Sequence, residues 1–481
     1  MKKLLAMLLA VVLVLGLAAC GGGSTTDPSG TAEQGGNTPS SKGNFTVPES
    51  GYDGSEVTIT FYHTMGSNLH DVLVLYIEEF NKLYPKIHIQ EEQVGGYDDV
   101  RDQISTQITV GNQPNIAYCY PDHVALYNLA KAVATLDDLI DSKIEVTRAD
   151  GSKEVLGLTD AQKADFIEGY YNEGRQFGDG LMYTMPFSKS TEVLYYNKTF
   201  FDANNLTPPK TWDEMEAVCR KIKAIDPKSI PLGYDSEANW FITMCEQQGS
   251  PYTSATEPHF LFDNDANKAF VKKFRSWYQE GLLTTQTIYG NYTSGLFVSD
   301  GETRSYMSIG SSAGATHQRP AEVDGKYPFE VGITTIPQVD ASKPKVISQG
   351  PSVCIFRKSN AQEVVASWLF VKFLTTSLEF QAEFSIASGY VPVLKSVASI
   401  PAYADFLAKA DGGKFVSALS AKICLTQVDA YYTSPAFNGS SRARSEVGAL
   451  LSKCLSAKDT DVDSLINKAF KTAVDECEYG Q

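Results

Sequence analysis

Residues 57–120 read VTITFYHTMGSNLHDVLVLYIEEFNKLYPKIHIQEEQVGGYDDVRDQISTQITVGNQPNIAYCY, and this stretch decides the fold. Apolar and polar side chains alternate along residues 57–61, which predicts a strand. Further apolar side chains then recur at spacings of three and four until Pro85, which predicts a helix that the proline ends. Residues 87–93 have strand character again. The stretch therefore begins as strand, helix, strand.

The same alternation continues to the end of the stretch. Val100, Ile104 and Ile108 predict a second helix, and residues 115–120 predict a third strand. This order predicts an α/β fold with parallel strands and right-handed crossovers. Ligands of such sheets bind beyond the carboxyl ends of the strands. The loops predicted to line a binding site are residues 62–68, 95–98 and 121–123.

Later segments continue the α/β pattern, and no internal repeat is visible. The predicted helices are 212–225, 267–280, 361–374 and 461–477, and the predicted strands are 182–184, 193–196, 305–309, 329–333 and 352–356. From residue 55 onward the chain holds roughly 425 residues, which exceeds one ordinary hydrophobic core, so we expect two domains. Its formal net charge of -16 argues against nucleic acid as a partner.

The N-terminus reads MKKLLAMLLAVVLVLGLAAC over residues 1–20. Two lysines precede an apolar run that is too short to span a bilayer comfortably, which is typical of a secretory signal peptide. Leu17-Ala18-Ala19-Cys20 resembles the lipobox of bacterial lipoproteins. That resemblance implies a signal peptide at 1–19, a lipid on Cys20 and a position on the outer face of the cell membrane. The alternative is an ordinary secretory signal followed by an accidental cysteine.

Residues 20–54 are predicted to be a flexible linker behind the anchor. They are rich in Gly, Ser, Thr and Pro, with no aromatic residue before Phe45, so they cannot bury a core. Thirty such residues reach about 30 Å. A linker of that length lets an anchored domain clear the lipid headgroups.

The cysteines and histidines predict neither a disulfide framework nor a metal site. Seven cysteines besides Cys20 are scattered without a C-x-x-C pair, and most are expected to be small buried side chains. A pairing of Cys454 with Cys477 stays open. The six histidines show no metal-ligand spacing, so no metal or other cofactor is expected.

One motif resembles a catalytic element. Residues 310–314 read GSSAG and match the G-x-S-x-G nucleophile elbow, but His317 is the sole later histidine and stands too close to serve as its partner. We interpret the segment as a tight loop with free N–H groups. The protein is therefore not expected to be an enzyme, and a secreted carbohydrate hydrolase is the alternative from another class.

Aromatic side chains in predicted strand-end loops suggest sugar binding, because a ring face packs on the C–H side of a sugar. Although most of the aromatic residues belong to the core, the candidates for ligand contact are Tyr62, Tyr97, Trp240, Tyr252 and Tyr390.

Two segments resemble a known family. Residues 183–198 read YTMPFSKSTEVLYYNK and residues 208–214 read PPKTWDE, and SGYVP at 388–392 supports them. They are similar to the family 1 extracellular solute-binding proteins, the receptors of carbohydrate ABC importers, and among these most to the glycerol-3-phosphate-binding type. The resemblance implies a two-lobed periplasmic-binding-protein fold of type II, with hinge strands between the lobes. It also implies a small-molecule ligand in the cleft, ABC permease subunits as partners, and a monomer.

Chain order under this resemblance puts residues 55–186 and 310–373 in the N-terminal lobe. Residues 187–309 and 374–481 form the C-terminal lobe. Positions that match the family's ligand contacts are Tyr97, Ser190, Ser311, Gly350 and Tyr390, and Trp240 falls in an aromatic-bearing loop of the second lobe.

Two departures from the family pattern bear on the ligand. The family's acidic contact aligns with Pro121, and Asp122 is adjacent. The arginine expected for a phosphate falls near Ala436 or Phe437, with Arg442 and Arg444 a few residues beyond. Because a missing arginine removes the main anchor for a phosphate, a neutral sugar or oligosaccharide is favoured over glycerol 3-phosphate. A receptor that feeds a membrane sensor is a further alternative.

Overall fold

The computed structural model describes residues 43–479 and contains two principal β-sheets. The predicted signal peptide and Cys20, the predicted lipidation site, lie outside these residues. In the first sheet the strand order is β2-β1-β3-β13-β6. Its strands are β1 (Val57–His63), β2 (Ile87–Gln93), β3 (Ile116–Cys119), β6 (Thr184–Pro186) and β13 (Ser352–Ile355).

The first sheet confirms the parallel pairing predicted from residues 57–120. β1 pairs in parallel with both β2 and β3, whereas β13 runs antiparallel between β3 and β6. A separate hairpin joins β4 (Glu145–Thr147) to β5 (Lys153–Val155). The helices of this part are α1 (Ser67–Leu83), α2 (Tyr97–Ile108), α3 (Pro121–Tyr127), α4 (Asp137–Asp141), α5 (Asp160–Asp165), α6 (Glu168–Glu173), α13 (Ala361–Thr376) and α14 (Leu378–Ser388), with the 3-10 helices η1 (Asn128–Ala130) and η3 (Lys395–Ser399).

Helix α1 shows why the sequence folds this way. Leu73, Tyr76, Ile77 and Phe80 are buried on one face at spacings of three and four, as predicted. The Phe80 ring packs against Phe370 of α13 with ring centroids 5.0 Å apart. The apolar face of α1 therefore joins the core that also covers the sheet.

The second sheet has seven strands, in the order β14-β12-β7-β10-β8-β9, and β11 also pairs with β7. Its strands are β7 (Ser190–Asn197), β8 (Leu232–Tyr234), β9 (Leu283–Thr285), β10 (Met307–Ser311), β11 (Val331–Thr335), β12 (Val346–Gln349) and β14 (Tyr431–Tyr432). Its helices are α7 (Lys198–Ala203), α8 (Trp212–Ile225), α9 (Glu237–Gln248), α10 (Asp265–Gln279), α11 (Gln286–Tyr289), α12 (Ser294–Phe297), α15 (Pro401–Ala408), α16 (Val416–Cys424), α17 (Ser440–Ser456) and α18 (Val462–Tyr479), with η2 (Ser312–Gln318) and η4 (Leu425–Ala430).

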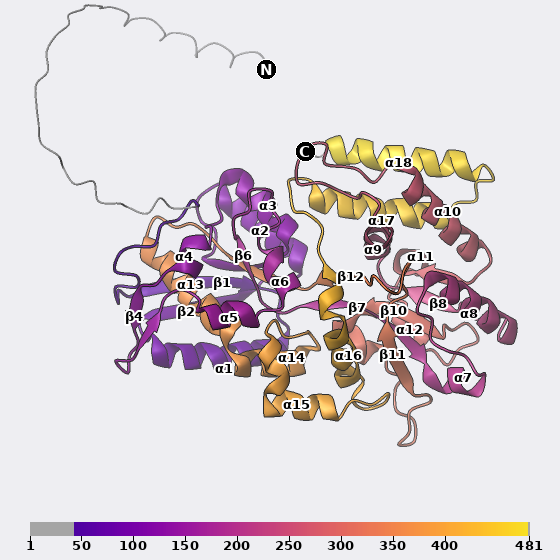
Figure 1. Cartoon of the computed structure of the whole chain (residues 1–481), viewed down its shortest axis with the longest axis horizontal. Coiled ribbons are helices and arrows are strands. Elements are labelled where there is room, and N and C mark those ends of the chain that lie inside the picture. Colours follow the sequence, from indigo (N-terminus) through magenta and orange to yellow (C-terminus); the bar gives the residue numbers. More distant parts are fainter. Residues whose placement is uncertain (1–42, 480–481) are drawn as a thin grey trace, which may run out of the picture. The chain divides into compact units, whose positions relative to one another are not determined.

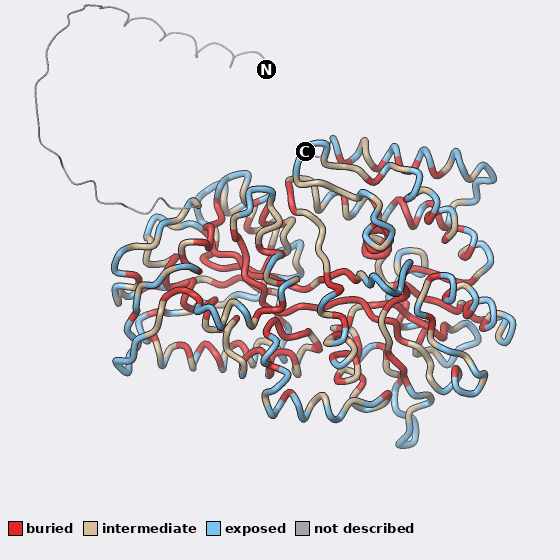
Figure 2. The backbone as a smooth tube through the Cα atoms, in the orientation of Figure 1, coloured by how far each residue is buried: buried red, intermediate tan, exposed pale blue. Residues whose placement is uncertain are grey.

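Figure 1 shows the two sheets with their helices, and α13 returning to the helices around the first sheet. The strands of both sheets are buried between solvent-exposed helices, as the red and pale-blue colours of Figure 2 show. The segment 310–373, predicted as part of one lobe, contributes β11 and β12 to the second sheet and β13 to the first. The exact lobe boundaries stay a prediction.

Two short connections carry the chain between the sheets. Residues 187–189 lead from β6 to β7, and residues 350–351 lead from β12 to β13. We refer to them as the two connections. The buried Lys189 links them, because its Nζ donates to Gly350 O at 3.1 Å and to Ser352 Oγ at 2.9 Å. Its ammonium group also pairs with Glu173, the last residue of α6.

The end of the predicted linker is packed on the body. Asn44 donates from its backbone N to Thr135 Oγ1 at 2.9 Å and from its side chain to Val133 O at 2.8 Å. Gln362 Nε2 donates to Gly51 O at 3.0 Å. Residues 43–54 therefore differ from the expected free linker, because Asn44 and Gly51 find hydrogen-bond partners and Phe45 packs against the core.

All seven cysteines in the described part are buried and unpaired, Cys454 and Cys477 included. Burial raises the pKa of the Cys454 thiol to about 11 and that of Cys477 to about 12. Among the described helices, none is both long and apolar enough to cross a membrane. Residues 43–479 contain no cluster of three or more side chains arranged to hold a metal ion.

Candidate ligand-binding site

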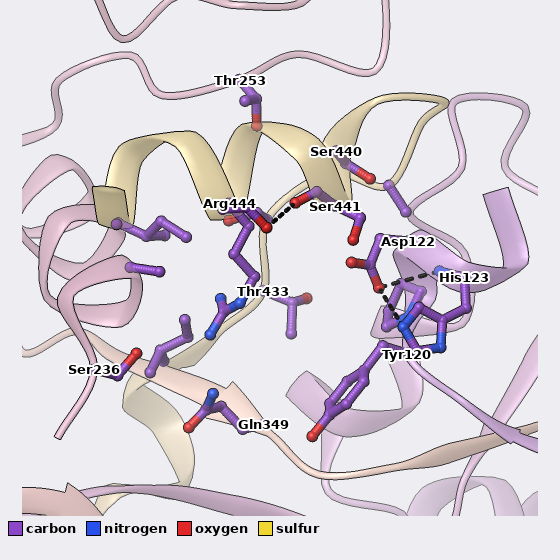
Figure 3. A pocket seen from close by; sticks show the side chains of 18 of the residues that line it. Tyr120, Asp122, His123, Ser236, Thr253, Gln349, Thr433, Ser440, Ser441 and Arg444 are labelled. Atoms are coloured by element: carbon purple, nitrogen blue, oxygen red, sulfur yellow. Dashed lines mark hydrogen bonds and ion pairs between the residues drawn. The ribbon is translucent and has the colours of Figure 1, made fainter. Parts of the chain in front are cut away.

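A cavity of about 630 Å³ lies between elements of the two sheets, and we call it the main cavity. The first residues of α2 and α3, which follow strands of the first sheet, line one side. The start of α9, the end of β12 and the first turns of α17 line the other side. Figure 3 shows Asp122 and His123 on one side and Arg444 and Gln349 facing them. Elements associated with both sheets thus contribute side chains to the lining.

Two tyrosines form the aromatic part of the main cavity. Tyr97 begins α2 and Tyr120 precedes α3, and their ring centroids lie 4.8 Å apart. Burial raises the pKa of both hydroxyls above their ordinary value, so they stay neutral at physiological pH. A neutral tyrosine offers a ring face for packing and a hydroxyl for hydrogen bonding.

Asp122 and His123 follow at the start of α3. Asp122 Oδ1 accepts from the backbone N of His123 at 3.1 Å and lies 4.0 Å from His123 Nε2. The His123 ring is 4% exposed, and burial lowers its pKa, so it is neutral at pH 7. Asp122 therefore faces the cavity with the neutral His123 ring beside it.

The two arginines that line the main cavity differ in their partners. Arg101 on α2 forms ion pairs with Asp98 and Asp102, each at 2.8 Å. Arg444 on α17 donates instead to the neutral Asn239 Oδ1, and it forms no ion pair with any described carboxylate. Its positive charge is thus available to a ligand.

Polar groups without charge complete the lining. Ser236 caps α9 and its Oγ accepts from Asn239 N at 3.2 Å, while Gln349 ends β12. Further hydroxyl groups in the lining belong to Thr433, Ser434, Ser440 and Ser441. Glu173 also reaches the lining, but its carboxylate is buried against Lys189.

Several residues predicted from sequence lie at this site. Tyr97, Asp122 and Tyr252 line the main cavity. Tyr390 lies beside Tyr97 in an adjacent smaller cavity of about 280 Å³, which also includes Tyr118. Burial raises the pKa of Tyr390 as well.

Other predicted residues lie beneath or beside the cavity. Tyr62 is buried, and its hydroxyl accepts from Gln107 Nε2 at 3.1 Å. Ser190 is buried at the start of β7 opposite Gln349, and the Ser311 Oγ accepts from Ala313 N at 3.2 Å. Gly350 holds a φ of +90° in one of the two connections. None of these four belongs to the cavity lining.

The expectation of Trp240 in a loop is corrected by the structure. Trp240 lies inside α9, is fully buried, and stacks on Tyr234 with ring centroids 4.8 Å apart. Helix α9 is buried on nearly all sides, so its sequence shows no alternation of polar and apolar faces. The segment therefore resembles a loop that carries an aromatic residue. Trp240 is a packing residue of the core.

The interpretation of GSSAG as a tight loop with free N–H groups is corrected by the structure, because Gly310 and Ser311 end strand β10, Ser312 begins η2, and Ala313 N donates to Ser311 Oγ. Ser312 is buried, and its Oγ accepts from Thr191 N at 3.2 Å. This hydroxyl is therefore occupied in packing and does not line the main cavity.

Sequence reasoning missed Tyr120, Gln349 and the position of Arg444. Arg444 was noted as lying beyond the expected arginine, yet it lines the main cavity because α17 turns its side chain toward Asn239. The argument for a neutral ligand assumed that no arginine reaches the site. The structure corrects that premise.

Comparisons with known proteins identify the family and the fold. The sequence profile of the bacterial extracellular solute-binding proteins matches residues 76–410. The sn-glycerol-3-phosphate-binding periplasmic protein UgpB of Escherichia coli K12 is 23% identical over 366 residues, which cover 74% of this chain and 78% of UgpB.

Solved structures share the fold. The cyclic α-maltosyl-1,6-maltose binding protein of Arthrobacter globiformis matches with a TM-score of 0.68 at 19% identity, over 89% of this chain and 100% of its own. UgpB of Mycobacterium tuberculosis, in complex with glycerophosphocholine, matches with a TM-score of 0.67 at 17% identity, over 88% and 98% of the two chains. These matches confirm the predicted two-lobed periplasmic-binding-protein fold. Since the family profile also matches more than half of the sequence, this chain belongs to the bacterial extracellular solute-binding proteins.

Proposed function

We propose that this chain is the lipid-anchored substrate-binding protein of an ABC importer. It captures a sugar or oligosaccharide in the main cavity and delivers it to the transmembrane subunits of the permease. Cys20 carries the lipid after removal of residues 1–19 and keeps the protein at the outer face of the cell membrane. The protein acts as a monomer, requires no cofactor and catalyses no reaction.

The observation that carries this proposal is the mixed lining of the main cavity. Tyr97 and Tyr120 offer ring faces to the C–H side of a sugar, while Asp122 and Gln349 offer polar atoms to its hydroxyls. These groups come from both sheets, so a bound ligand is contacted from two sides. Such a ligand favours the state in which both sides are close, because that state gives it more contacts.

Closure is expected to rotate the two sheets about the two connections, residues 187–189 and 350–351. Domain closure around a ligand is a known motion of binding proteins of this kind. Tyr97 and Asp122 contact the ligand directly, and Tyr390 extends the site beside Tyr97. Ser190, Ser311 and Gly350 do not line the main cavity in this structure, and they contact the ligand once the cleft has closed.

The test combines thermal shift with small-angle X-ray scattering on the mature chain. A ligand at 100 times its Kd stabilises the folded state by about 2.7 kcal/mol, so maltose and longer maltodextrins are expected to raise the Tm. The same ligand is expected to reduce the radius of gyration. Tyr97→Ala should abolish both effects, whereas Tyr479→Ala, at an exposed position near the C-terminus, should preserve them. A confirmed ligand that leaves the radius of gyration unchanged would contradict hinge closure.

A phosphorylated polyol is the second candidate ligand, and Arg444 is the observation that favours it. This guanidinium lines the main cavity without a carboxylate partner among the described residues. The UgpB relatives are named for glycerol 3-phosphate or were solved with glycerophosphocholine. Parallel thermal shifts with sn-glycerol 3-phosphate and maltotriose separate the two candidates.

A further inference from the structure

A buried network beneath the main cavity reaches two of its lining residues. Its centre is Asn239 on α9, which is 3% exposed and does not line the cavity itself. The Asn239 Oδ1 accepts from Gln349 Nε2 at 3.1 Å and also from the Arg444 guanidinium. One amide oxygen therefore holds both cavity donors.

Glu192 fixes the orientation of that amide. Asn239 Nδ2 donates to Glu192 Oε1 at 2.9 Å, and Tyr234 OH donates to the other carboxylate oxygen at 2.6 Å. Because the NH₂ group of Asn239 is engaged by the carboxylate, its oxygen must face Arg444 and Gln349. Glu192 is 1% exposed on β7, so this support belongs to the rigid core of the second sheet.

The network leaves Arg444 oriented but not neutralised. Among residues 43–479 its acceptor is the uncharged amide of Asn239, in contrast to Arg101, whose charge two carboxylates compensate. Burial raises the pKa of Glu192 to about 7, which further limits the negative charge beneath the cavity near neutral pH. A cation held in place beside a second donor, Gln349, matches the oxygens of an anionic group.

We infer that Asn239 is the positioning residue of an anion subsite in the main cavity, at which Arg444 and Gln349 bind the phosphate of a phosphorylated polyol. This inference rests on the proposed function, because it assigns a subsite within the same ligand cavity. Glu192 acts through Asn239 by keeping the amide oxygen turned toward the two donors. The rest of the polyol lies toward Tyr97, Tyr120 and Asp122.

The test is calorimetric titration of the mature chain at low salt, with sn-glycerol 3-phosphate, inorganic phosphate and maltotriose as separate probes. The wild type is expected to bind sn-glycerol 3-phosphate. Arg444→Ala should weaken this binding about 10- to 100-fold, the range for a hydrogen bond to a charged group. Arg442→Ala is the matched control, because Arg442 is exposed on the same helix and pairs with Glu446 and Glu476, both at 2.9 Å. It should change the affinity less than twofold.

Two substitutions in the network distinguish positioning from general support of the fold. Asn239→Asp keeps an oxygen acceptor but gives Arg444 an ionised partner, so it should weaken anion binding more than Asn239→Ala does. A purely structural role predicts the opposite order. Glu192→Gln, which preserves shape, should weaken anion binding to a lesser extent than Asn239→Asp does.

The outcomes separate the subsite from the proposed function. A wild type that binds maltotriose but neither sn-glycerol 3-phosphate nor inorganic phosphate overturns the anion subsite and leaves the proposed function standing. A chain that binds none of the probes contradicts both. Equal anion affinity in the wild type and Asn239→Asp overturns the positioning role of Asn239.

Discussion

Replacing Lys189 by Met tests whether one buried cation holds the two connections together. The side chain is fully buried, and its Nζ donates to Gly350 O at 3.1 Å and Ser352 Oγ at 2.9 Å besides its ion pair with Glu173. Methionine has a similar length but no charge, so the substitution leaves the Glu173 carboxylate buried without a cation. We expect the variant to fold with reduced stability.

The size of the effect follows from these contacts. Removing one partner of a buried ion pair costs about 3–5 kcal/mol. The entropy of unfolding is about 2.1 cal/mol/K per residue, so a loss of about 4 kcal/mol lowers the Tm of a chain of this length by about 4 °C. Urea unfolding and calorimetric scans at pH 7 measure the two quantities.

The pH dependence gives a second signature of the same pair. Burial raises the pKa of Glu173, and the charge of Lys189 opposes that rise. Without Lys189 the pKa rises further, and a carboxyl group with a raised pKa in the folded state loses stabilisation as the pH increases through that value. The deficit of Lys189→Met relative to the wild type should therefore be larger at pH 8 than at pH 5.

A matched double variant controls for lost packing. In Lys189→Met with Glu173→Gln, the buried charge is gone, so much of the stability should return. A Lys189→Met protein that loses less than about 1 kcal/mol, or whose deficit is the same at pH 5 and pH 8, would refute the reasoning.

Three further predictions concern other parts of the fold. Glu154 accepts from Tyr84 OH at 2.6 Å, Arg148 Nε at 2.9 Å and Lys372 Nζ at 2.9 Å. Burial alone would raise the pKa of Glu154, but the hydrogen bonds from Arg148 and Tyr84 outweigh burial and lower the pKa. Glu154→Gln should therefore reduce the free energy of unfolding by about 2–3 kcal/mol at pH 7. Because a lowered carboxyl pKa stabilises the fold only above that pKa, the difference should shrink in melts near pH 3. Gly350→Ala places a Cβ 2.5 Å from Ser188 O at a φ of +90°, whereas Gly290→Ala, at a φ of +81°, meets no atom within 4 Å. In urea unfolding, Gly290→Ala should lower the free energy of unfolding by about 1–2 kcal/mol, and Gly350→Ala should lower it further. Equal decreases for the two variants would contradict the clash at Gly350. Trp240→Ala should reduce the free energy of unfolding by about 3–5 kcal/mol in the same assay. Because Trp240 lies in the core, the folded variant should keep the ligand Kd within about twofold of the wild-type value. A large rise in Kd would indicate that Trp240 contacts the ligand after all.

The first strands and helices were predicted well from sequence, because the spacing of their apolar residues is visible in short segments. The strands expected at 57–61, 87–93 and 115–120 correspond to β1, β2 and β3, and the helix ending at Pro85 corresponds to α1. The predicted helix 212–225 matches α8, whose N-cap Thr211 accepts from Glu214 N. Amphipathic spacing and caps are properties of neighbouring residues, so the sequence alone exposes them.

The missed parts depend on tertiary contacts. Helix α9 is buried on nearly all sides, so residues 239–245 show no polar face from which a helix could be recognised. The site has the same difficulty, because Asp122, Gln349 and Arg444 line one cavity although they are far apart in the sequence. Family resemblance supplied Tyr97 and Tyr390. It could not supply Asn239, whose role comes from the contacts of its amide.

The burial of the native thiols makes this chain suitable for site-specific labelling with fluorescent dyes. Every cysteine between residues 43 and 479 is buried and unpaired, and burial raises the pKa of thiols such as Cys424 to about 12, so little reactive thiolate forms at pH 7. A pair of cysteines introduced on exposed helices of the two sheets, in a chain begun after Cys20, could then carry fluorescent labels without removal of any native cysteine. Distance changes between the labels would test the proposed ligand-dependent rotation in single molecules.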